Sequence, residues 1–213
     1  SVTKEYDFIY ICLKQDEKKE TCEDWATYNK NWELAQKCLK VMCERHKLRG
    51  LLVGRSDCKL PGICHQLMDT TNMLEYSKML ETYKKAKFLF VPNRADASPR
   101  VITEALLTDL PILVNENILG GWKYVNEHTG EFFNDENDVG QAVEKLIAGM
   151  EKKQYNPRDY YVKNYSVENS GKKLKEFLYK HWGNEINIPE DQVDYISPEF
   201  SKKDFKTCKS SVL

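Results

Sequence analysis

The sequence has no apolar run approaching the roughly 20 residues of a membrane-spanning helix, and its formal net charge is only −1. The first absence predicts no transmembrane segment. The second argues against a protein that binds nucleic acid mainly through charge. The sequence also contains no internal repeat, and no G-x-G-x-x-G motif follows an apolar segment. A dehydrogenase that binds a dinucleotide at such a motif is therefore disfavoured.

The seven cysteines include no Cys-x-x-Cys pair. The single loose cluster of metal-ligating types is Cys58, Cys64 and His65, and a zinc site needs more closely spaced ligand pairs. We therefore expect reduced thiols, no metal site and a cytoplasmic location. The cysteines are Cys12, Cys22, Cys38, Cys43, Cys58, Cys64 and Cys208.

The N-terminal residues are polar, and the first residue is not methionine. We expect no signal peptide here and interpret the chain as a domain taken from a longer protein. Of the 213 residues, 41% are hydrophobic and 31% charged. This composition and length are typical of a soluble globular protein with one domain or slightly more.

Short apolar segments alternate with segments of helical periodicity. This alternation predicts an α/β fold: a doubly wound, mostly parallel, Rossmann-like sheet with helices on both faces. We expect strands at residues 7–13, 51–53, 70–74, 88–91, 112–114 and 131–133, and helices at 29–47, 61–68, 76–86, 100–107, 135–150, 156–165 and 166–181.

The last part of the chain differs in composition. After Gly183 the sequence is polar and contains Pro189 and Pro198. We therefore predict one domain over residues 1–183, including its C-terminal helices, and a polar tail over residues 184–213.

The most informative stretch is 93–115, where a predicted strand is followed by a loop, a helix and another strand. Ser98 and Pro99 suit a helix start, with Ser98 as N-cap and Pro99 as the first helical residue. The free amides of Arg100 and Val101 would then face the carboxyl edge of the sheet, where they suit a phosphate. Asp96 lies in the loop and Glu104 in the helix; the alternative is that both are surface acids.

The order and spacing of several motifs resemble the retaining glycosyltransferases of the GT-B fold, the "glycosyltransferase group 1" family. Asp96-x7-Glu104 resembles the family's Glu-x7-Glu motif, and Gly120-Gly121 its Gly-Gly loop. Lys30-Asn31 resembles the Lys-Gly pair before its first helix, with Asn31 in place of glycine. The resemblance covers residues 6–150.

The resemblance implies a role for each matching residue. Glu104 would hold the ribose hydroxyls of a nucleotide-sugar, and Asp96 would face the sugar at the transfer point. Lys30 and Lys14 would neutralise the diphosphate, and Gly120 and Gly121 would lie beside sugar and phosphate. Besides Asn31, three features depart from the family: Asp96 replaces a longer Glu, Lys14 replaces Arg, and the loop at 97–99 lacks glycine.

The resemblance thus implies the donor-binding half of a retaining, metal-independent glycosyltransferase without a cofactor. Its partners would be a nucleotide-diphosphate sugar and an acceptor-binding N-terminal-type domain that this chain lacks. The Asp-x-Asp metal motif of the other glycosyltransferase fold is absent. Two alternatives stay open: a module of the same fold that binds nucleotide-sugar without transfer, and another α/β enzyme such as a nucleotide-sugar epimerase.

Overall fold

The computed structural model describes residues 3–13, 22, 25–56, 58–97 and 99–182. A six-stranded sheet lies at its centre, with the strand order β3-β2-β1-β4-β5-β6 and parallel pairing throughout. All six expected strands are present, and the predicted doubly wound fold is confirmed. The strands are β1 (Tyr6–Ile11), β2 (Gly50–Val53), β3 (Met68–Thr71), β4 (Ala86–Val91), β5 (Ile112–Asn115) and β6 (Gly130–Phe133).

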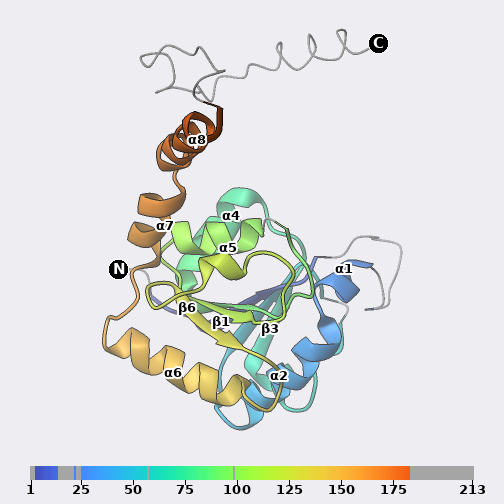
Figure 1. The fold of residues 1–213 in the computed structure, drawn as a ribbon. Coiled ribbons are helices and arrows are strands. Elements are labelled where there is room, and N and C mark those ends of the chain that lie inside the picture. The colour runs from blue at the N-terminus through green and yellow to red at the C-terminus, as the bar shows by residue number, and fades with distance from the viewer. Residues whose placement is uncertain (1–2, 14–21, 23–24, 57, 98, 183–213) are drawn as a thin grey trace, which may run out of the picture. The chain divides into compact units, whose positions relative to one another are not determined.

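Helices cover both faces of the sheet (Figure 1). Helices α2 and α6 pack together on one face, and α4 and α5 pack on β4 and β5 from the other. The helices are α1 (Trp25–Asn29), α2 (Trp32–Glu44), α3 (Cys64–Leu67), α4 (Tyr76–Lys85), α5 (Arg100–Leu107), the 3-10 turn η1 (Trp122–Tyr124), α6 (Val139–Glu151), α7 (Pro157–Tyr165) and α8 (Val167–Trp182).

The central strands are buried on both faces, which explains their continuous apolar sequence. Phe8 and Tyr10 of β1 point to the same face and pack against Phe88 and Phe90 of β4. Helix α2 places Trp32 against Tyr10, with ring centroids 6.2 Å apart. This aromatic layer fixes the start of α2 relative to the ends of β1 and β4.

Some element boundaries differ from those predicted. The third strand is Met68–Thr71 rather than 70–74. It is an edge strand whose middle residues Asp69 and Thr70 are exposed, so it lacks a strong apolar signal. The helix predicted at 29–47 begins only at Trp32, because Asn31 has left-handed backbone angles (φ 56°, ψ 54°), and the short helix α1 before it was not predicted.

The expectation of reduced thiols is wrong for four cysteines. Cys22 is bonded to Cys58 and Cys43 to Cys64, each pair with Cα atoms 5.5 Å apart. Spacing along the chain gave no sign of either bridge, because the tertiary fold brings together residues that are 36 and 21 positions apart. Cys12 and Cys38 are buried, and neither forms a disulfide bond with another described cysteine.

The chain divides into two compact units between Tyr161 and Val162. In the second unit, the amide of Asn169 donates to Ser166 Oγ at 3.2 Å, as expected of a serine N-cap. The predicted tail at 184–213 lies outside the described residues, and the predicted domain over 1–183 stays a prediction. No described helix is long and apolar enough to span a membrane.

Candidate functional site

The strand order reverses direction between β1 and β4. In open α/β sheets, ligands bind at the carboxyl ends of the strands beside such a switch point. The segment after β4 and the turn before α2 meet here: the amide of Arg94 donates to Asn29 O at 2.9 Å. The predicted residues Lys30 and Asp96 belong to these two segments.

Lys30 is held by its neighbours in the core. The buried Tyr10 hydroxyl donates to Lys30 O at 2.8 Å. Asn31 is 6% exposed, and its side-chain amide donates to Pro92 O at 3.0 Å. Left-handed backbone angles favour glycine, and asparagine is among the few other residues that tolerate them. Asn31 thus adopts the backbone conformation for which glycine is expected at this position. Its side chain adds a hydrogen bond to Pro92, at the end of β4.

Lys30 and Asp96 form an ion pair with 3.4 Å between Lys30 Nζ and Asp96 Oδ2. Their side chains are 12% and 24% exposed, respectively. The sequence separates them by 66 positions, and the fold brings them together at the switch point. A cation and an anion in contact can interact with opposite ends of a polar ligand that carries hydroxyl groups and a phosphate.

The two glycines lie directly against this segment. Gly120 and Gly121 have φ angles of 89° and 79°. A Cβ atom at Gly120 would lie 2.5 Å from Asp96 O, and one at Gly121 would lie 2.6 Å from Pro99 Cγ. Leu119 O accepts the amide of Asp96 at 2.9 Å. Both the left-handed angles and the close contact therefore require glycine.

Helix α5 begins at Arg100, with Pro99 in the N-cap position and not the first helical residue as predicted. The amides of Ile102 and Thr103 both donate to Pro99 O, at 3.0 and 3.2 Å. Across the part of the chain that is described, the amides of Arg100 and Val101 have no hydrogen-bond partner. They are available to an anion, as expected at a helix N-terminus. Ser98 and Lys14, both predicted site residues, lie outside the described residues.

Glu104 lies farther along α5, where the buried Tyr83 of α4 donates its hydroxyl to Glu104 Oε2 at 3.1 Å. Burial, and then the negative charge of Glu104, raise the pKa of Tyr83 well above its ordinary value. The phenol therefore stays protonated and can only donate to the carboxylate. One Glu104 oxygen is oriented by this bond, which leaves Oε1 as an acceptor for a ligand.

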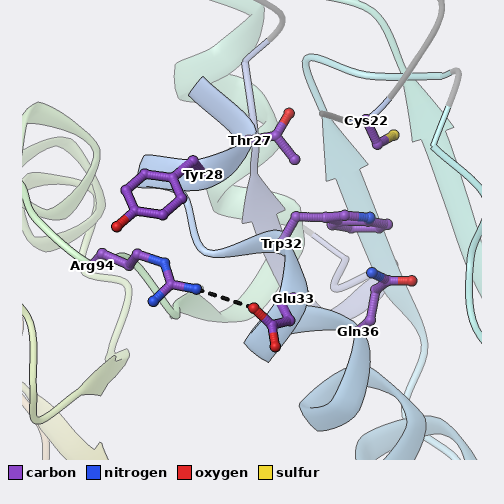
Figure 2. A pocket seen from close by; sticks show the side chains of 7 residues that line it. All are labelled: Cys22, Thr27, Tyr28, Trp32, Glu33, Gln36 and Arg94. Carbon is purple, nitrogen blue, oxygen red and sulfur yellow. Dashed lines mark hydrogen bonds and ion pairs between the residues drawn. The ribbon is translucent and has the colours of Figure 1, made fainter. Parts of the chain in front are cut away.

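A cavity of about 260 Å³, here named the α1–α2 cavity, opens beside the start of α2 (Figure 2). The Arg94 guanidinium lies over the Tyr28 ring, 4.7 Å from its centroid, and its Nη2 is 3.3 Å from Glu33 Oε2. Arg94 is thus held between an aromatic ring and a carboxylate. The cavity is lined by Cys22, Thr27, Tyr28, Trp32, Glu33, Gln36 and Arg94.

Three residues that contribute to the geometry of the candidate site were not predicted as site residues. Tyr83, Arg94 and Tyr10 belong to none of the motifs found in the sequence. Each acts through a tertiary contact with a residue at least 20 positions away. Within the described ranges, no three metal-ligating side chains gather at one point; metal independence stays a prediction.

No protein-family model matches this chain, and no curated protein matches it. Several solved structures do. Sucrose-phosphate synthase from Thermosynechococcus elongatus has a TM-score of 0.58 at 15% identity; the match covers 84% of this chain and 46% of that one.

Anabaena HepE in complex with UDP-glucose has a TM-score of 0.57 at 12% identity, with 83% of this chain and 49% of that one covered. S. aureus TarM has a TM-score of 0.58 at 12% identity; the match covers 83% of this chain and 36% of that one. This chain therefore spans less than half the length of each of these proteins.

These structures are glycosyltransferases of the GT-B type, and the likeness shows that this chain has the fold of one part of them. The fold predicted from the motif resemblance is confirmed. At these identities the comparison says nothing about individual side chains, so the roles of Lys30, Asp96 and Glu104 depend on the local geometry described above.

Proposed function

We propose that this chain binds a nucleotide-diphosphate sugar and, with an acceptor-binding domain, transfers the sugar with retention of configuration. The observation that carries the proposal is the contact between Lys30 and Asp96 at the switch point. Both residues were predicted from separate motifs, and the glycine pair and the start of α5 lie against the same segment. HepE, which shares the fold, has been solved with UDP-glucose.

Each group has a distinct role in this proposal. Lys30 and the amides of Arg100 and Val101 bind the diphosphate, whose negative charge grows as the bond to the sugar breaks. Stabilising such developing charge is often the largest contribution to catalysis. Asp96 accepts hydrogen bonds from the sugar, and Glu104 Oε1 accepts them from the ribose. The nucleotide-sugar is the substrate, and neither a cofactor nor a metal is proposed.

Retention requires the acceptor hydroxyl to add on the face from which the diphosphate departs. The anomeric carbon–oxygen bond to the diphosphate breaks as the new glycosidic bond forms, and the hydroxyl proton passes to the departing diphosphate oxygen. In this proposal, Lys30 stabilises that oxygen. The acceptor itself would be held largely by a second domain, in keeping with the partial coverage of the GT-B structures.

One observation favours a second candidate function. Asp96, which is shorter than the glutamate of the family, is already paired with Lys30. A module that binds nucleotide-sugar without transferring it would tolerate this pairing. Turnover assays with the chain joined to its acceptor domain separate the two, because the module would bind donor without releasing nucleoside diphosphate.

The test is calorimetric titration with UDP, GDP, ADP and their sugars. We expect one nucleotide to bind, and Glu104→Ala to weaken it by about 100-fold or more, since two hydrogen bonds to a charged group are worth about 3 kcal/mol or more. Glu81→Ala, an exposed acid of α4, serves as the matched control. If Glu104→Ala and Glu81→Ala bind the nucleotide with equal affinity, the assignment of this chain as the donor-binding domain is wrong.

A further inference from the structure

We propose that the α1–α2 cavity binds the sugar acceptor as a neutral sugar ring. The inference depends on the proposed function, because it names the second substrate of the same site. The cavity adjoins the turn that carries the ion pair: Lys30, the partner of Asp96, lies between the cavity residues Tyr28 and Trp32 in the sequence.

The other wall of the cavity also leads to the transfer point. Arg94 and Asp96 flank Ala95, which pairs with Leu119 in an isolated parallel bridge. This segment is therefore extended, and its Cα atoms advance by about 3.3 Å per residue. Arg94 and Asp96 are thus separated by roughly 7 Å, close to the span of one sugar ring, so a ring in the cavity can direct a hydroxyl toward the sugar held at Asp96.

The charges in the cavity fit a neutral ligand. Among the described lining residues, only Glu33 and Arg94 are charged, and they are paired at 3.3 Å. These described lining residues therefore offer no net positive charge to a phosphate, unlike the free amides at the start of α5. A volume of about 260 Å³ equals the space of about eight or nine water molecules, which suits a single ring rather than a long chain.

The polar groups match sugar hydroxyls. Arg94 has further N–H donors beyond the one that reaches Glu33, and the Glu33 and Gln36 side chains supply acceptor oxygens. Tyr28, which is 56% exposed, adds aromatic surface, against which the C–H groups of a sugar can pack. Figure 2 shows Arg94 reaching toward Glu33, with Trp32 and Gln36 on the other side of the view. An aromatic wall with a few convergent polar groups is typical of a specific small-ligand site.

The cavity is organised before any ligand arrives. Arg94 is fixed by the Tyr28 ring and by Glu33, and its backbone bonds to Asn29 and Leu119 at 2.9 Å each. Trp32 is 6% exposed and stacks on Tyr10. Such fixed groups lose little conformational entropy on binding, which favours recognition of a small, weakly bound ligand.

The experiment is saturation-transfer difference NMR on the whole chain, in saturating UDP, with glucose, galactose, mannose, xylose, fucose and N-acetylglucosamine as probes. We expect at least one sugar to bind. Tyr28→Ala and Gln36→Ala should each weaken it at least fivefold, while the surface control Glu81→Ala leaves it unchanged. Both cavity variants should keep the wild-type melting temperature and UDP affinity, because Tyr28 is 56% exposed and Gln36 is partly exposed.

Two outcomes would overturn the inference while leaving the donor assignment intact. The first is that none of the six sugars binds although UDP does. The second is that UDP-glucose, but not UDP, displaces the bound sugar, which would place that sugar in the donor subsite. If the proposed function is wrong, the result is different. UDP then does not bind, while any sugar binding still depends on Tyr28 and Gln36.

Discussion

At the scale of single residues, the candidate site consists of polar groups that constrain one another. Lys30 contacts Asp96, and Tyr83 contacts Glu104. Neither acid is free to rotate like a surface carboxylate, so the interpretation of both as solvated surface acids is less favoured. Tyr83 then has a testable role: it orients the carboxylate that would receive the ribose.

We therefore expect Tyr83→Phe to weaken binding of the nucleotide by about threefold to tenfold, because one net hydrogen bond is worth about 0.5–1.5 kcal/mol. The measurement is calorimetric titration with the nucleotide and its 2′,3′-dideoxy analogue. The analogue lacks the hydroxyls that Glu104 would hold, so its affinity should be the same in both proteins. Equal weakening for the two ligands would mean that Tyr83 serves the packing of α4 on α5 and not ribose recognition.

At the scale of elements, the site depends on how closely the Gly-Gly loop approaches the segment after β4. Gly120→Ala would place a Cβ atom 2.5 Å from Asp96 O and hold alanine at φ 89°. The loop and Asp96 must then move apart, and we expect nucleotide-sugar affinity to fall at least tenfold, which is about 1.4 kcal/mol.

Gly171→Ala is the matched control for this change. Gly171 lies within α8, where a Cβ atom would meet nothing within 4 Å. Alanine there should stabilise the helix by about 0.5–1 kcal/mol and leave affinity unchanged. The two variants are compared by titration with the same nucleotide-sugar, and wild-type affinity in Gly120→Ala would show that the contact with Asp96 does not matter for the donor.

The elements also show what the sequence alone could predict. The central strands were predicted to within two residues and α5 to the residue, because they are continuous apolar segments or have a clear start. The edge strand β3 was displaced toward Met73, an apolar residue that is in fact 68% exposed. The Lys30, Asp96 and Glu104 positions followed from motif spacing. Tyr83 and Arg94 could not be predicted, because their roles come from contacts between distant elements.

At the scale of the whole molecule, the two disulfides connect segments that the sheet topology alone leaves independent. Cys22–Cys58 connects the segment before α1 to the loop after β2, and Cys43–Cys64 connects α2 to α3. Cys22 also lines the α1–α2 cavity. The bridges therefore support the face of the molecule on which the proposed acceptor subsite lies.

Reduction should then lower the free energy of unfolding. Closing loops of 36 and 21 residues restricts the unfolded chain, and each bridge contributes about 2–4 kcal/mol. We expect denaturant unfolding in a strong reductant to shift to a clearly lower midpoint, and both Cys22→Ser/Cys58→Ser and Cys43→Ser/Cys64→Ser to lower the midpoint without reductant. In a variant with all four of these cysteines replaced by serine, the unfolding midpoint should not respond to reductant. This control separates the loss of the bridges from other effects of the reagent. An unchanged midpoint in the wild-type protein would instead favour the reduced thiols that the cysteine spacing had indicated, and the face around the cavity would then depend on packing alone.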